Sequence, residues 1–171
     1  MRVFIAYELP EKVSIYLRQK QKEIETDSAR MVFPKQFHLT FKFLGEKKEQ
    51  EIEQIKKDLN KIDFKPINAK LNGTGVFQNE ERINVFWAGL EPKEDIIKLQ
   101  KQIDEDERFH PHITIARIKS VKDKEKLKSI LDKVELKEME FEINKIKLIK
   151  SILTTEGPNY EELACIKAKP L

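Results

Sequence analysis

Two segments of the chain, which begin at residues 38 and 112 and so lie 74 positions apart, repeat one short pattern. Residues 38–40 read His-Leu-Thr and residues 112–114 read His-Ile-Thr, and apolar residues continue to alternate after each. Alternation with a period of two predicts β-strands in which histidine and threonine share one face and the apolar residues share the other. The chain is therefore expected to place two imidazole and hydroxyl pairs on sheet faces opposite a core.

The remaining hydrophobic pattern alternates strands with helices. Apolar residues at helical spacing follow each repeated strand, so the chain reads as two similar halves. We expect strands at 2–8, 38–44, 67–71, 73–77, 83–89, 112–117, 139–143, 145–153 and 160–168, and helices at 11–24, 49–62, 94–105 and 121–134, with polar turns at 79–81 and 156–159. Such interspersed elements predict an α+β fold in which a pseudo-two-fold axis lines one central cleft with both histidine strands.

Length and composition set the class of the chain. A chain of 171 residues with 39% hydrophobic and 37% charged residues predicts one domain, 1–171, with a packed core and a charged surface. The net charge of +3 permits an anionic partner without demanding one. Cys165 is the sole cysteine, which excludes an internal disulfide and predicts a cytoplasmic location. We also expect no membrane segment, because no apolar run approaches the length of a span.

Paired imidazoles suit acid-base chemistry on a phosphate ester. One neutral imidazole takes a proton from the nucleophile while the other, protonated, donates one to the leaving oxygen, so His38 and His112 are the predicted catalytic residues. The hydroxyls of Thr40 and Thr114 can donate to non-bridging phosphate oxygens. His110 and His112 form a conceivable metal pair, but no second cysteine and no helical histidine pair accompanies them, so we expect no metal and no cofactor.

The chain as a whole resembles the two-histidine (2H) phosphoesterases, in particular the archaeal and bacterial RNA 2',3'-cyclic phosphodiesterases, historically called 2'-5' RNA ligases. The residues that carry the resemblance are Arg2-Val3-Phe4-Ile5-Ala6, Leu9-Pro10, His38-Leu39-Thr40, Phe43-Leu44-Gly45, Gly73 through Phe77, Val85-Phe86-Trp87-Ala88-Gly89, Phe109, Pro111-His112-Ile113-Thr114, Arg117, Ser151, Leu153, Gly157-Pro158 and Tyr160.

The resemblance implies a bilobal fold with antiparallel sheets around a central cleft and helices on the outer faces. It also implies metal-independent hydrolysis of an RNA terminal 2',3'-cyclic phosphate to a 2'-phosphate, with reversible 2'-5' ligation in some members. By carry-over, His112 is the base and His38 the acid, although symmetry leaves the two roles interchangeable in the sequence. The implied partner is an RNA with a cyclic phosphate end, and we expect a monomer with no obligate protein partner.

Further residues are predicted to bind the substrate. Arg117 matches the family arginine that binds phosphate, but strict alternation points it away from His112 unless a bulge intervenes. Lys42 shares the parity of His38 and is expected to help bind phosphate, whereas Phe4 and Tyr160 are candidates to stack on a nucleobase. Trp87 is expected in the core, and the turn at 77–82 is a candidate to approach the substrate.

Three other functions remain open at this point. The first is a 2H phosphodiesterase that acts on a small cyclic nucleotide, such as a cyclic phosphate of ADP-ribose. The second is an RNA-end binding protein without turnover, against which the intact motifs count. The third is a hydrolase that depends on a metal held by His110 and His112, which would lose activity with a chelator.

Overall fold

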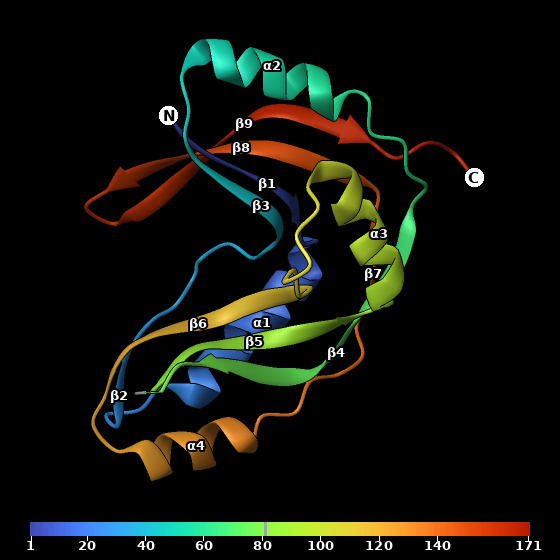
Figure 1. Cartoon of the computed structure of the whole chain (residues 1–171). Helices are drawn as coiled ribbons and strands as arrows, with labels where there is room; N and C mark the ends of the chain where they lie inside the picture. Colours follow the sequence, from blue (N-terminus) through green and yellow to red (C-terminus); the bar gives the residue numbers. More distant parts are fainter. Residues whose placement is uncertain (81) are drawn as a thin grey trace.

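The computed structural model describes residues 1–80 and 82–171, and within them nine antiparallel strands form one sheet flanked by four helices (Figure 1). The strand order is β7-β4-β5-β6-β3-β1-β8-β9, and β2 pairs with β6. The elements are β1 (Arg2–Glu8), α1 (Glu11–Ile24), β2 (Ala29–Val32), β3 (His38–Glu46), α2 (Glu49–Leu59), β4 (Ile67–Gln78), β5 (Ile83–Glu91), α3 (Lys93–Ile103), β6 (His112–Val121), α4 (Lys124–Asp132), β7 (Glu140–Ile143), β8 (Lys145–Thr154) and β9 (Gly157–Lys167).

The fold has the predicted bilobal, pseudo-two-fold arrangement. β3 and β6 meet in the middle of the sheet, flanked by β1 on one side and β5 on the other. The sheet curls, so that β1, β3, β8 and β9 form one lobe and β4, β5 and β6 the other (Figure 1). α2 covers the first lobe and α4 the second (Figure 1). The two halves are thus joined in a single continuous sheet rather than in separate sheets.

All four helices pack on one core. Each contributes buried side chains to the same hydrophobic cluster, among them Leu17, Ile52, Ile96 and Leu127. The apolar residues of the strands that face the helices complete this cluster. Along the described chain, no helix is both long and apolar enough to cross a membrane.

The sheet has a second apolar surface on its other face. Phe4, Ala6 and Ile149 are buried in a small separate cluster, against which Tyr160 packs. β1 is therefore buried on both faces, which explains its run of five buried residues where alternation would leave a polar face. The face that carries this small cluster also carries the histidines, as shown below, and we call it the histidine face.

The secondary structure departs from the predicted elements where tertiary pairing decides. β2 lies in a segment expected to be a connector, and it is a four-residue strand held by its pairing with β6. The two strands predicted at 67–71 and 73–77 are one strand, β4, with a register shift between Leu71 and Thr74 and a positive φ of 68° at Gly73. α4 starts at Lys124 because the Asp123 side chain accepts a hydrogen bond from the Lys126 amide.

Candidate active site

The two His-x-Thr segments meet at the centre of the sheet. Leu39 of β3 and Ile113 of β6, the middle residues of the two motifs, are antiparallel cross-strand partners and both are fully buried. Continuing this register places His38 opposite Thr114 and Thr40 opposite His112. The two histidines are then diagonal neighbours, a relation that puts Cα atoms about 7–8 Å apart in a regular antiparallel pair. A single phosphate group can lie between two imidazoles at such a separation.

A β-bulge in β6 turns Arg117 toward the histidine face. The register between β5 and β6 shifts between Thr114 and Ala116, so that Ile115 is an extra residue. Ile115 and Ala116 are both fully buried in the main core, and alternation resumes with an exposed Arg117. Arg117 therefore lies on the same face as His112, and β6 contains the bulge that the prediction for this residue required.

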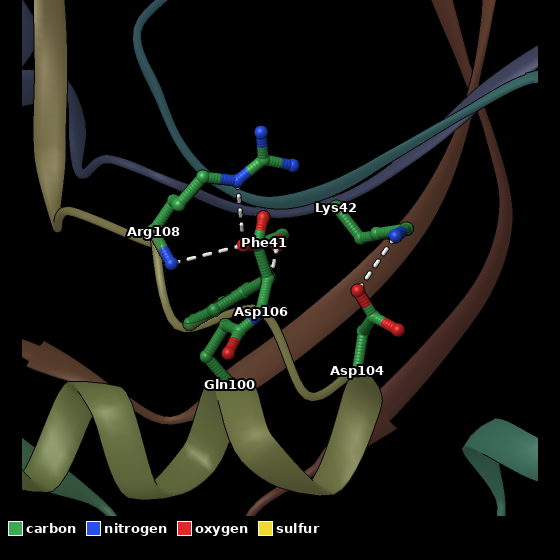
Figure 2. A network of polar contacts seen from close by, with 6 residues as sticks. All are labelled: Phe41, Lys42, Gln100, Asp104, Asp106 and Arg108. Atoms are coloured by element: carbon green, nitrogen blue, oxygen red, sulfur yellow. Dashed lines mark hydrogen bonds and ion pairs between the residues drawn. The ribbon is translucent and has the colours of Figure 1, made fainter.

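β3 has a bulge at the corresponding position, and it turns Lys42 away from the histidine face. Thr40 pairs with Ala6 and Lys42 pairs with Ile5, so Phe41 is the extra residue. Cross-strand partners share a face, and Ile5 belongs to the main core, so Lys42 does not share the face of the histidine as strict alternation predicted. Its Nζ lies 2.6 Å from Oδ2 of Asp104 instead (Figure 2). Lys42 is therefore not retained among the candidate phosphate ligands.

Polar contacts connect the end of α3 to β3, and others lie within the segment before β6 (Figure 2). Besides the Lys42 to Asp104 ion pair, the Gln100 amide nitrogen donates to the Phe41 carbonyl at 3.5 Å. The carboxylate of Asp106 accepts from the Arg108 amide at 2.9 Å. The contacts of Gln100 and Asp104 thus tie the end of α3 to β3 beside its bulge, and the Asp106 to Arg108 contact is internal to the segment that leads into His112.

Phe43 occupies in β3 the place that Arg117 occupies in β6, three residues after the threonine. It is the cross-strand partner of Phe4, and the two ring centroids are 5.9 Å apart. Phe4 is 6% exposed, whereas Phe43 is 68% exposed. Phe4 is thus buried beneath Phe43, and Phe43 offers a free aromatic surface. Aligning the two motifs residue by residue would have found Phe43 in the sequence.

His112 is fixed by its own chain and by aromatic rings. Its Nδ1 lies 2.7 Å from the His110 carbonyl oxygen, and because a carbonyl only accepts, Nδ1 carries the proton. In the neutral ring, Nε2 is then the free basic nitrogen. The Phe77 ring meets His112 edge to face with centroids 4.9 Å apart. Burial lowers the pKa of His112, the hydrogen bond to the His110 backbone raises it, and the charges of the His110 ring and of Arg117 lower it further.

Trp87 lies beside the histidines rather than in the core. It is the cross-strand partner of Thr114, and its ring centroid is 4.8 Å from that of His110. Within the described residues, Trp87 Nε1 and His110 Nδ1 are buried without a hydrogen-bond partner. The described residues include no group of three or more His, Cys, Asp and Glu side chains placed to hold a metal ion.

Part of the turn predicted at 77–82 does contribute to these surroundings, since Phe77 packs on His112. At the far end of the turn, the Arg82 guanidinium donates to the Asn84 side chain at 3.2 Å. Glu81 lies outside the described residues.

His38 is surrounded by rings from two strands of its lobe. The ring centroid of Tyr160 is 5.1 Å and that of Phe4 is 5.5 Å from His38, each edge to face. Burial lowers the pKa of His38, the carboxylate of Glu8 raises it and the ammonium of Lys147 lowers it. Unlike His112, the His38 ring makes no hydrogen bond within the described residues.

Arg117 acts electrostatically on both lobes. Burial raises the pKa of the Tyr160 hydroxyl on β9, and the charge of Arg117 lowers it, as it lowers that of His112 on β6. Thr40 and Thr114 are half-buried, and neither hydroxyl hydrogen-bonds to another protein atom in the part of the chain described. The histidine face thus brings together two imidazoles, two free hydroxyls, one guanidinium and an aromatic surface.

A curled antiparallel sheet that joins two His-x-Thr strands at its centre is the architecture expected of the two-histidine phosphoesterases. The chain belongs to the family described as LigT like phosphoesterase, whose profile matches residues 8–87 and 90–160. It is 34% identical over 172 residues to an RNA 2',3'-cyclic phosphodiesterase of Methanocaldococcus jannaschii, covering 94% of this chain and 97% of the relative. It is 32% identical to the protein of the same name from Aquifex aeolicus, covering 94% and 93% of the two chains.

Solved structures agree on the fold. The crystal structure of the Thermus thermophilus protein TT0787 matches with a TM-score of 0.73 and 28% identity over 98% of this chain and 97% of that one. E. coli LigT complexed with 3'-AMP matches with a TM-score of 0.77 over the same shares of the two chains. Its identity is 20%, so this second likeness concerns the fold alone.

Proposed function

We propose that this phosphoesterase hydrolyses the 2',3'-cyclic phosphate at the end of an RNA to a 2'-phosphate by acid-base catalysis between His38 and His112. The observation that carries the proposal is the pairing of Leu39 with Ile113, which brings both His-x-Thr segments onto one face. The names of relatives that are 32–34% identical over nearly the full length support the substrate class.

His112 is the base in this mechanism. Its Nδ1 proton is held by the His110 carbonyl, so Nε2 is left to take a proton from water. The nearby positive charge of Arg117 also favours the neutral ring. The water oxygen attacks phosphorus, and the proton it loses passes to His112.

His38 is the acid. It donates a proton to the 3' oxygen as the bond between phosphorus and that oxygen breaks, which leaves a 2'-phosphate and a free 3'-hydroxyl. Negative charge on the non-bridging oxygens grows during this step and is met by the hydroxyls of Thr40 and Thr114 and by the Arg117 guanidinium. The next turnover begins when the two histidines exchange their protons with water.

The nucleoside portion has an aromatic environment on the first lobe. Phe43 offers an exposed ring face, and Tyr160 lies half-buried beside His38. Bases at RNA ends stack on such side chains. Action as a monomer, a cytoplasmic location and a single domain over 1–171 remain predictions.

The test compares the full chain with its H38A, H112A and H110A variants in excess chelator. The substrates are an oligoribonucleotide that ends in a 2',3'-cyclic phosphate and a nucleoside 2',3'-cyclic phosphate, and the product isomer is identified. We expect a 2'-phosphate from the wild type, loss of turnover in H38A and H112A, and turnover within a few-fold of wild type in H110A.

Other outcomes would select one of the competing functions. Activity that chelator and H110A both abolish would indicate a metal held by His110 and His112. RNA binding without hydrolysis would indicate an RNA-end binding protein. A kcat/KM for ADP-ribose cyclic phosphate far above that for the oligoribonucleotide would indicate a small cyclic nucleotide as substrate.

A further inference from the structure

A chain of three charged residues lies beside His38. Glu8, the last residue of β1, is the direct cross-strand partner of His38. Its Oε2 is 3.0 Å from Nζ of Lys147, and the same ammonium is 3.0 Å from Oε1 of Glu162. The Lys147 side chain is only 15% exposed, against 45% for Glu8 and 50% for Glu162. We call these three residues the Glu8 network.

The network lies on the histidine face. Lys147 is the cross-strand partner of Ala6, whose side chain belongs to the small apolar cluster of that face. Glu8 follows Ala6 by two positions in β1 and therefore shares its face. The carboxylate and the imidazole thus project from adjacent strands in the same direction.

Within the described residues, no carboxylate occupies the equivalent cross-strand position beside His112 in the other lobe. The cross-strand partner of His112 at the position equivalent to Glu8 is Gly89, which has no side chain. The groups whose charge acts on His112 are instead His110 and Arg117, and both lower its pKa. A carboxylate that raises the pKa therefore stands beside His38, opposed by the Lys147 ammonium, whereas the charged groups that act on His112 both lower its pKa.

We infer that Glu8 is a positioning residue that favours the protonated form of His38 and thereby fixes it as the acid of the pair. Lys147 limits this effect, since its ammonium opposes the carboxylate from the same side, and Glu162 holds the ammonium in place. The inference rests on the proposed function for its catalytic consequence. Its electrostatic part concerns His38 alone and can be measured without turnover.

The direction of each effect follows from Coulomb interaction with the imidazolium. Glu8 raises the pKa of His38 and Lys147 lowers it, while burial of the ring sets the baseline below the ordinary value. The charged and titratable groups on the histidine face of the strands around His38 include Glu8 on β1, Lys147 on β8, Tyr160 and Glu162 on β9, and His112 and Arg117 on β6. Of these, Glu8 is the carboxylate directly opposite His38.

Two substitutions that break the same ion pair separate this role from a merely structural one. The titration of His38 is followed by NMR in the full-length wild type, E8Q and K147M. We expect the pKa of His38 to fall by roughly half a pH unit in E8Q and to rise by a similar amount in K147M. A structural role of the ion pair predicts shifts of the same sign, and shifts of the same sign or none would overturn the inference.

The matched control is E138Q, which removes the carboxylate of the exposed Lys70 to Glu138 ion pair, whose atoms are also 3.0 Å apart. This variant should leave the His38 titration unchanged. A shift as large as that of E8Q would mean that any loss of charge on the protein has this effect, and would also overturn the inference.

The catalytic consequence is read from the pH dependence of kcat/KM. The acid must be protonated, so its pKa sets the alkaline limb of the profile, and in E8Q this limb should move to lower pH while the acidic limb stays. If the acidic limb moves instead, His38 is the base and the inference fails although the proposed hydrolysis stands. If no variant or wild type turns over, the proposed function fails while the NMR result still decides the role of Glu8.

Discussion

The two lobes share a backbone plan but present different chemistry to the histidine face. Both motif strands have a bulge directly after the threonine, at Phe41 in β3 and at Ile115 in β6. Both bulges return the third residue after the threonine to the histidine face. In β6 that residue is the cation Arg117, whereas in β3 it is the exposed aromatic Phe43. The repeated geometry therefore positions side chains, and the sequence of each lobe decides what they do.

The histidines differ in the same way. His112 has its Nδ1 proton held by a main-chain carbonyl, and His38 faces the carboxylate of Glu8 across the strand pair. A symmetric pair of imidazoles in equal surroundings would have no reason to divide the roles of acid and base. The unequal surroundings supply one, and the following predictions test how far the difference between the lobes extends.

The largest effect is expected from removing either histidine. H38A and H112A should each lower kcat by roughly 10²–10⁴-fold, because each proton transfer loses its donor or acceptor. The double variant should be little worse than either single one, since the two groups act in one step. Steady-state kinetics with thermal unfolding as a check on the fold measures this, and a normal rate in either single variant would refute paired catalysis.

Arg117 is expected to come next. R117A should lower kcat/KM by roughly 10²-fold, because a cation that meets transition-state charge is lost. R117K should recover only part of this, since an ammonium cannot replace two parallel guanidinium hydrogen bonds. Kinetics on a nucleoside 2',3'-cyclic phosphate tests the prediction, and a loss below threefold in R117A would remove the residue from the site.

Phe43 should have a smaller effect that depends on the base. F43A should lower kcat/KM on a nucleoside 2',3'-cyclic phosphate by roughly tenfold, as expected for one lost stacking contact, while F43W retains activity. A ribose 2',3'-cyclic phosphate without a base should be hydrolysed equally by wild type and F43A. L153A, at an apolar residue that is 71% exposed, is the control. Equal losses on both substrates would argue against stacking.

The shared burial of the two histidines should set the pH optimum. Burial disfavours the imidazolium and lowers the pKa of both rings from the ordinary value of 6.5. The reactive form has one proton on the pair, so its population peaks between the two apparent pKa values. The bell-shaped profile of kcat/KM should therefore have its maximum below pH 6.5. A maximum above pH 7 would show that burial does not control these groups in the free enzyme.

Lys42 should matter least. Its ammonium is paired with Asp104 away from the histidine face, so K42M should change kcat/KM by less than about threefold and stability by no more than about 1 kcal/mol. Parallel kinetics and chemical unfolding measure both quantities. A loss comparable to that of R117A would mean that Lys42 turns toward the phosphate when substrate binds.

The local periodicity of apolar residues was sufficient to predict most of the helices and strands. The predicted ends of β1 and α1 agree with the structure, and both motif strands were placed, because alternation and helical spacing are properties of neighbouring residues. β2 was missed because a four-residue strand that pairs with β6 alone is held by its partner and not by its own pattern. The role of the two histidines could be proposed from the sequence because two of three histidines stand in the same strand pattern.

Which residues other than the two motifs belong to the site could not be predicted from periodicity. The parity argument failed at Lys42 because the bulge at Phe41 inserts one residue and reverses the faces of the side chains directly after it. Trp87 was expected in the core because its apolar neighbours carry no sign of which face it occupies. Glu8 was not among the predicted site residues, since nothing in residues 2–8 reveals which side chain lies across the strand pair.

The sequence by itself determined that this chain carries two strands with an imidazole and a hydroxyl on one face, repeated in two halves with helices behind them. The tertiary structure decided that the two strands are neighbours. It also decided that Arg117 and Phe43 lie on the histidine face while Lys42 does not, and that His112 contacts a main-chain carbonyl whereas His38 lies opposite the Glu8 carboxylate. The physical reason is that side-chain periodicity depends on residues adjacent in the chain. Cross-strand register, bulges and the charges around a side chain depend on residues that meet only when the strands pair.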